Sequence, residues 1–142
     1  VFQGAAKAGI WLNTCEGDLF PTHLEGGAAM TFQTGIANYG VRDASANLNE
    51  AKLAAVATNE QVRMFEINPN RGAKPGKSGI SPEAKVTGEI ARISAIAEGE
   101  DPISPNRNPA IDSAEELLVA IARVRRVAGK SFDFEAPIDA YG

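Results

Sequence analysis

The stretch DSAEELLVAIARVRRVAGKSFDFEAPI, residues 112–138, decides the predicted fold because it joins a helix pattern directly to a strand pattern. Ser113, followed three residues later by Glu116, is the pattern of a helix-capping box. Apolar residues then recur at spacings of three and four, which predicts one buried helix face made of Leu117, Leu118, Ile121, Val124 and Val127. Gly129 can end the helix, and the alternation F-D-F-E after it is typical of the start of a strand.

The same order of helix and strand occurs earlier in the chain. Residues 47–58 are rich in alanine and favour a helix, and residues 61–68, QVRMFEIN, favour a short buried strand. Two more strands are predicted at residues 8–14 and 29–35, and a further helix begins at about Thr87. This alternation predicts an α/β protein with parallel strands.

The stretch NRGAKPGKSGISPEAKV, residues 70–86, is rich in glycine, proline and lysine and is predicted to be neither helix nor strand. It matches neither the Walker A pattern nor G-x-G-x-x-G. Backbone amides freed by glycine, with Lys74 and Lys77 nearby, suit an anionic group. A solvated turn without a ligand is the simpler interpretation of this loop.

The second loop, residues 98–110, is rich in proline and carries Arg107. A guanidinium donates two parallel hydrogen bonds to a carboxylate, which makes Arg107 a candidate contact for an acidic substrate. The alternative is an exposed ion pair with an acid such as Asp112. Cys15 and His23 invite comparison with a Cys–His nucleophile, but their spacing favours a small buried cysteine and a loop histidine bonded to the backbone.

The composition argues against several kinds of site and partner. A chain of 142 residues with one cysteine and one histidine has room for one domain, but not for an intrachain disulfide or a Cys-rich or His-rich metal site. The net charge of −4 gives no general reason to expect nucleic acid or an anionic membrane as a partner. Because no long apolar run occurs, we expect no membrane span, and the low cysteine content favours a reducing, cytoplasmic setting.

Taken in order, the segments resemble the FMN-binding, synthase part of glutamate synthase. NTCEGDLFPTH, residues 13–23, is similar to the family's N-T-G-E-G-G-x-S-P-Y-H, and residues 23–43 resemble the family's next strand and its glycine-rich turn. Residues 63–93 resemble E-I-K-L-S-Q-G-A-K-P-G followed by K-V-T-x-E-I-A. Residues 100–130 resemble D-C-I-S-P-x-R-H and the helix after it.

The resemblance implies a (β/α)₈ TIM barrel with FMN at the carboxyl ends of its strands. Since such a barrel takes about 250 residues, we expect residues 1–142 to form one segment of it, incomplete at both ends and inactive alone. The implied enzyme is an oxidoreductase of glutamate biosynthesis and nitrogen metabolism. It joins ammonia, free or derived from glutamine, to 2-oxoglutarate and reduces the product to glutamate. An iron–sulfur cluster belongs to the full-length family only, since its ligands have no counterpart here.

The resemblance also implies site residues. Glu16 matches the acid of the first motif and is the candidate catalytic residue. The candidate substrate-binding residues are Arg107, Lys74, Arg71 and Asn68. The candidate cofactor-binding residues are Gly72, Gly76 and Glu135.

Several positions depart from the family pattern. Asn68 stands in place of a lysine, Arg71 in place of a glutamine, and Glu135 where a flavin-facing lysine is expected. Cys15 and Asp18 replace glycines. The departures at Asn68, Arg71 and Glu135 favour a second interpretation, a non-catalytic α/β binding or assembly module descended from the barrel. The absence of an initiator Met and the stop within a strand pattern favour a segment of an enzyme. A third interpretation is an unrelated small α/β ligand-binding protein.

Overall fold

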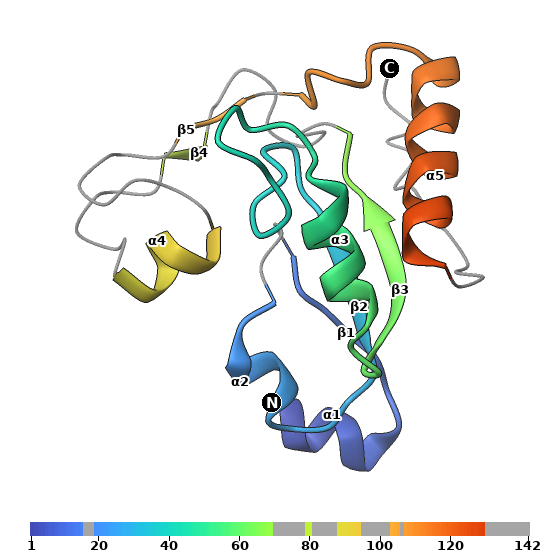
Figure 1. The fold of residues 1–142 in the computed structure, drawn as a ribbon. Coiled ribbons are helices and arrows are strands. Elements are labelled where there is room, and N and C mark those ends of the chain that lie inside the picture. Colours follow the sequence, from blue (N-terminus) through green and yellow to red (C-terminus); the bar gives the residue numbers. More distant parts are fainter. Residues whose placement is uncertain (16–18, 70–78, 81–87, 95–102, 106, 130–142) are drawn as a thin grey trace.

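A computed structural model describes residues 1–15, 19–69, 79–80, 88–94, 103–105 and 107–129 (Figure 1). In chain order, its elements are α1 (Phe2–Ala8), β1 (Leu12–Asn13), α2 (Pro21–Leu24), β2 (Met30–Thr34), α3 (Glu50–Ala57), β3 (Val62–Ile67), β4 (Gly79–Ile80), α4 (Gly88–Ser94), β5 (Ile103–Ser104) and α5 (Ala114–Ala128).

The main sheet is parallel and has the order β1-β2-β3. Leu12 pairs with Met30, and after a register shift between Met30 and Thr31 the strands β2 and β3 run in register to Thr34 and Ile67. Helix α2 lies between β1 and β2, and α3 lies between β2 and β3, so the chain returns to the opposite end before each next strand, which parallel neighbours require. The prediction of an α/β fold with parallel strands is confirmed, and the arrangement is consistent with part of a (β/α)₈ barrel.

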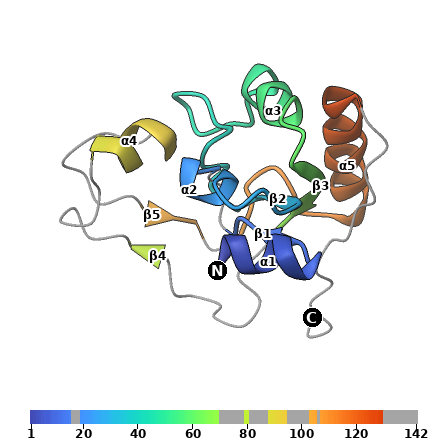
Figure 2. The same ribbon diagram turned by 90° about the horizontal axis from the view of Figure 1, so that it is seen from below.

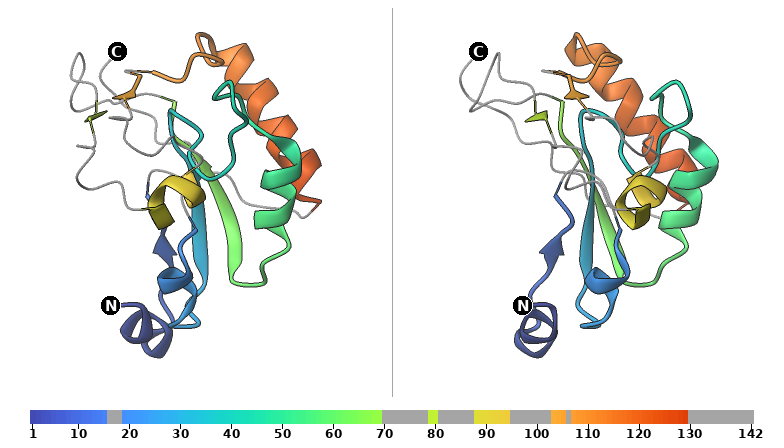
Figure 3. Two further views of the ribbon diagram at one scale, coloured as in Figure 1. Left: turned by 60° about the vertical axis from the view of Figure 1, so that its left-hand side comes forward. Right: turned by 90° about the vertical axis from the view of Figure 1, so that its left-hand side faces the viewer.

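Helices α3 and α5 lie side by side over one face of this sheet (Figure 3). Phe32 and Phe65 project from neighbouring strands into the layer between sheet and helices, where their rings lie 5.7 Å apart and both side chains are fully buried. Leu53 of α3 and Val124 of α5 close the same core from the helix side. Alternate strand residues therefore face the helices, and those between them face the other way.

Helix α5 follows the predicted pattern at both ends. The Ser113 side chain accepts a hydrogen bond from the Glu116 amide, and Gly129 closes the helix with a φ of 64°. The Glu116 carboxylate accepts from the Asp112 amide, so it caps one residue earlier than a capping box requires. Leu118 was wrongly predicted to be buried, because it lies a third of a turn away from Val124 and is 65 % exposed.

The amino-terminal region differs from the prediction. The expected strand at residues 8–14 is reduced to Leu12–Asn13, because the alanine-rich segment before it forms α1 and ends at Gly9 with a φ of 67°. Helices α1 and α2 lie at the amino-terminal end of the sheet, as Figure 2 shows from below. The helix predicted from about Thr87 is confirmed as α4.

The two loops predicted to lack strands contain one short antiparallel pair, in which Gly79–Ile80 bonds to Ile103–Ser104. Such a pair joins segments far apart in the chain, so neither segment carries a local signal for it. The strand predicted after Gly129 lies outside the described residues.

Candidate functional site

Three polar side chains form a row on the sheet face that points away from α3 and α5. Asn13 ends β1, Gln33 is the next-to-last residue of β2, and Glu66 is the next-to-last residue of β3. Gln33 and Glu66 are direct partners in the strand register. Because these strands are parallel, their carboxyl ends meet at one edge of the sheet, and the row lies there. We call Asn13, Gln33 and Glu66 the polar row.

The polar row is held together by hydrogen bonds to the Glu66 carboxylate. Asn13 Nδ2 donates to Glu66 Oε2 over 2.6 Å, and Gln33 Nε2 donates to Oε1 over 2.5 Å. Both donors are neutral amides, so they orient the carboxylate without neutralising its charge. The ion pairs of the described residues join Arg107 to Asp112, and Arg123 and Arg126 to Glu50; none involves Glu66.

The turn after β1 is tied to the same row. Asn13 Oδ1 accepts a hydrogen bond from the Cys15 amide over 2.8 Å, and Cys15 has a φ of 59°. A positive φ favours glycine, which is the residue expected at this position from the family pattern. Cys15 was wrongly predicted to be buried: it is exposed, because the left-handed turn points its side chain away from the core.

Asn68 and Arg107 lie on neighbouring chain segments. The Asn68 amide donates to the Thr34 carbonyl over 3.0 Å and extends the pairing of β2 with β3. The Asn108 amide donates to the Pro69 carbonyl over 2.7 Å, which places the loop of Arg107 beside the end of β3. Arg107 Nη1 forms an ion pair with Asp112 Oδ1 at 3.0 Å, and the Arg107 side chain is 69 % exposed.

The other predicted site residues lie outside the described part of the chain. They are Glu16, Arg71, Gly72, Lys74, Gly76 and Glu135. Their assignments therefore stay predictions.

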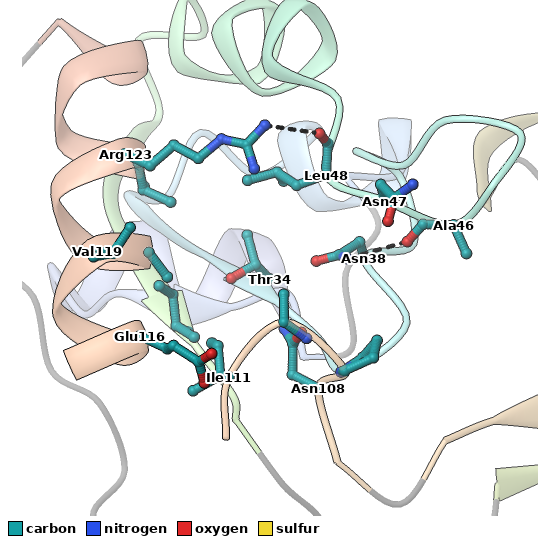
Figure 4. A pocket seen from close by; sticks show the side chains of 15 residues that line it. Thr34, Asn38, Ala46, Asn47, Leu48, Asn108, Ile111, Glu116, Val119 and Arg123 are labelled. Carbon is teal, nitrogen blue, oxygen red and sulfur yellow. Dashed lines mark hydrogen bonds between the residues drawn. The ribbon is translucent and has the colours of Figure 1, made fainter. Parts of the chain in front are cut away.

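A pocket of about 230 Å³ lies on the helix side of the same strand ends (Figure 4). It is lined by Thr34 and Ile67 at the strand ends and by Val119, Arg123 and other residues of α5. Two of its polar side chains already have partners within the chain: Asn38 donates to the Ala46 carbonyl, and Arg123 donates to the Leu48 carbonyl. Neither Asn68 nor Arg107 lines it. The polar row is therefore the better candidate for chemistry.

His23 serves a local structural role. Its Nδ1 accepts a hydrogen bond from the Phe20 amide over 3.1 Å, as predicted for a backbone-bonded histidine, although it lies in α2 rather than in a loop. The described residues contain no group of three or more His, Cys, Asp or Glu that can hold a metal ion. None of the helices in the described part is long and apolar enough to cross a membrane.

The polar row was missed by sequence reasoning although part of its signal was present. In AMTFQTG and QVRMFEIN, Gln33 and Glu66 directly follow the buried Phe32 and Phe65, so a period of two places both on the opposite face. The local pattern carries no signal for the strand register that makes them partners. It also carries none for the hydrogen bond that Asn13 makes across β2 to Glu66.

Parallel strands with covering helices, and polar groups gathered at the carboxyl ends of the strands, define an α/β fold that is consistent with part of a (β/α)₈ barrel. A family model described as "Conserved region in glutamate synthase" matches residues 1–134. The chain belongs to this glutamate synthase family.

Two curated relatives agree with this assignment. The chain is 34 % identical over 122 residues to the glutamate synthase large subunit-like protein YerD of Bacillus subtilis (strain 168), a match that covers 86 % of this chain and 23 % of the relative. It is 31 % identical over 115 residues to the archaeal-type glutamate synthase [NADPH] of Dehalococcoides mccartyi, a match that covers 81 % of this chain and 20 % of the relative. The chain thus spans roughly a fifth to a quarter of the length of these relatives.

Proposed function

We propose that the complete protein carrying this chain is an FMN-dependent oxidoreductase that converts 2-oxoglutarate and ammonia to glutamate. The observation that carries the proposal is the family match over residues 1–134, on a chain whose polar row lies at the carboxyl ends of parallel strands. Reactions on barrel folds take place at that end. Exposed Ile10 and Trp11 beside β1 support the further proposal that the remainder of a barrel packs there.

The residues near the polar row suit a flavin in their chemistry. Met64 lies on the same sheet face and adds an apolar, polarisable side chain beside the Gln33 amide and the Glu66 carboxylate. A flavin ring has apolar faces and polar edges, so it suits a surface where apolar and polar side chains lie together. The proposed FMN contacts of this chain are Gly72, Gly76 and Glu135. When bound, FMN supplies the hydride that reduces the imine carbon.

The substrate is a dianion, so its binding requires cations and hydrogen-bond donors. We assign this role to Arg107, Lys74, Arg71 and Asn68. Arg107 is paired with Asp112 at the surface, where an ion pair contributes little to stability. A substrate carboxylate can therefore replace Asp112 at small cost and gain a bidentate contact.

The bond changes follow from the reactants. The ammonia nitrogen attacks the ketone carbon of 2-oxoglutarate, the carbon–oxygen bond breaks, and water leaves. These steps need a group that moves a proton from nitrogen to the departing oxygen, and we assign that role to Glu16. Hydride addition to the same carbon, with a proton to the nitrogen, then gives glutamate.

The test is a single turnover of the complete, FMN-loaded protein under anaerobic conditions. We expect reduced flavin to be reoxidised only when 2-oxoglutarate and ammonium are both present, with one glutamate formed per flavin. A protein that binds reduced flavin but makes no glutamate from these reactants would contradict the proposal.

The second candidate function is a non-catalytic binding or assembly module. Two observations favour it: Asn68 stands where the family pattern has a lysine, and Arg107 already has an acidic partner in Asp112. Asn68→Lys separates the two functions. A gain of glutamate formation in the Asn68→Lys variant of an otherwise inactive protein would show that the scaffold remains competent and that the substitution had removed the activity.

A further inference from the structure

We propose that the Glu66 carboxylate, held between Asn13 and Gln33, is the docking site for the ammonium ion that supplies the amino nitrogen. This inference rests on the proposed function for the identity of the cation. It adds a ligand class for three residues to which the family resemblance assigns no role.

Glu66 is half-buried, and both of its oxygens accept hydrogen bonds from neutral amides. Hydrogen bonds from neutral groups leave the full negative charge on the carboxylate. Among the described residues, no ion pair involves Glu66. The carboxylate can therefore attract a cation.

The atoms of the polar row that are available to a ligand are oxygens. The Gln33 and Asn13 side chains both direct their NH₂ groups at Glu66, which leaves their oxygen atoms as acceptors. Asn13 Oδ1 accepts from the Cys15 amide and keeps one free lone pair, and each carboxylate oxygen keeps further acceptor capacity. The row thus presents several oxygen acceptors and one negative charge. An ion with one positive charge and four N–H donors matches this set.

Calcium takes six to eight oxygen ligands, and magnesium needs near-ideal octahedral geometry; both are usually bound through several carboxylates, waters or phosphates. The polar row has one carboxylate, and the described residues form no larger acidic or metal-binding group. The site therefore favours a monovalent cation over a divalent one.

Glu66 lies within β3, and Asn68, a proposed contact of 2-oxoglutarate, is the first residue after that strand. The carboxyl end of the sheet is also where the keto carbon must lie for the proposed reaction. Ammonium held there is close to its reaction partner, which raises its effective concentration. Before its nitrogen attacks the keto carbon, the ion gives up one proton, and Glu16, the proposed proton-transfer group, is the acceptor.

The test uses Glu66→Gln in the complete protein. Glutamine keeps the size of the side chain, and the Asn13 and Gln33 amides can rotate to bond with it, so the substitution removes mainly the charge. We expect KM for ammonium to rise by about tenfold to a hundredfold, the effect of one charge-assisted hydrogen bond, with KM for 2-oxoglutarate unchanged. Glu60→Gln, an exposed glutamate on the turn before β3, is the matched control and leaves both KM values unchanged.

A second measurement does not depend on turnover. Ammonium chloride, compared with tetramethylammonium chloride at the same ionic strength, raises the Tm of the unmodified protein in a saturable way, and Glu66→Gln abolishes the rise. Should Glu66→Gln not fold, Gln33→Ala removes one acceptor and produces a smaller rise in KM for ammonium.

The outcomes are separable. A folded, active Glu66→Gln variant with unchanged KM for ammonium overturns the inference, as does a change confined to KM for 2-oxoglutarate or an unchanged KM for ammonium in Gln33→Ala. A complete protein that makes no glutamate contradicts the proposed function instead. In that case, a rise in Tm that is specific to ammonium and is lost in Glu66→Gln still supports the cation site. If ammonium does not raise the Tm of the unmodified protein, the cation site is contradicted as well.

Discussion

Arg123 Nε lies 2.7 Å from Glu50 Oε1 and joins α5 to α3 between residues 73 positions apart in the chain. Arg126 Nη2 reaches the same oxygen at 3.1 Å. The hydrogen bond from Arg123 holds the pKa of Glu50 below its ordinary value, against some desolvation and with help from the charges of both arginines. The carboxylate thus links the two helices that cover the sheet.

Glu50→Gln is expected to lower the free energy of unfolding slightly at neutral pH. Since the pKa of Glu50 is lower in the folded than in the unfolded state, its stabilising effect is present above the unfolded value and is lost as pH falls through the folded value. Urea unfolding at neutral pH and at about pH 3 measures this, with Glu60→Gln as control. If Glu50→Gln and the unmodified protein differ in free energy of unfolding by the same amount at the lower pH, the assignment is contradicted. High salt should reduce the difference in free energy of unfolding at neutral pH.

Phe65→Ala should destabilise the protein by about 3–5 kcal/mol, because it opens a cavity in a fully buried aromatic pair. Thermal or denaturant unfolding of the complete protein measures the loss. Leu118→Ala is the control: its side chain is 65 % exposed, so we expect a change within about 0.5 kcal/mol. A larger effect of Leu118→Ala would show that another part of the protein covers this side of α5.

Cys15→Gly should be more stable than Cys15→Ala by about 1 kcal/mol. Both substitutions remove the thiol, but only glycine relieves the steric cost of the positive φ at this position. Comparing the unfolding midpoints of the two variants isolates the backbone effect. Equal stabilities would indicate that the turn after β1 adopts another conformation in solution.

Arg107→Ala should raise KM for 2-oxoglutarate by about tenfold to a hundredfold if Arg107 binds a substrate carboxylate. Asp112→Ala releases Arg107 from its surface ion pair and should leave KM for 2-oxoglutarate equal or lower. Steady-state kinetics of the complete protein measures both. An unchanged KM in Arg107→Ala would remove this residue from the site and leave the exposed ion pair as its role.

Much of the fold could be predicted because its signals are local. Ser113 and Gly129 mark the ends of α5 through cap hydrogen bonds and a left-handed turn that involve only nearby backbone. The strands β2 and β3 each carry one buried phenylalanine, Phe32 and Phe65, followed by a half-buried polar residue, and the helices between strands imply that the strands are parallel. Family membership, too, was readable from the motifs.

The candidate site could be predicted only in part. The motifs predicted Arg107 and Asn68 as substrate contacts, and the structure places their segments side by side through the bond from the Asn108 amide to the Pro69 carbonyl. The sequence motifs did not predict the hydrogen bonds of Asn13 and Gln33 to Glu66. These bonds depend on the strand order and on a strand register that includes a shift after Met30.

The sequence by itself determined the helices α3, α4 and α5, the parallel strands and the family, since each depends on patterns or motifs a few residues long. Only the tertiary structure decided which polar side chains meet at the carboxyl ends of the strands, that Cys15 is exposed, and that Leu118 lies outside the core. The physical reason is that cross-strand hydrogen bonds and burial are set by which segments pack together. Which segments pack together depends on interactions along the whole chain, so no single position in the sequence reveals it.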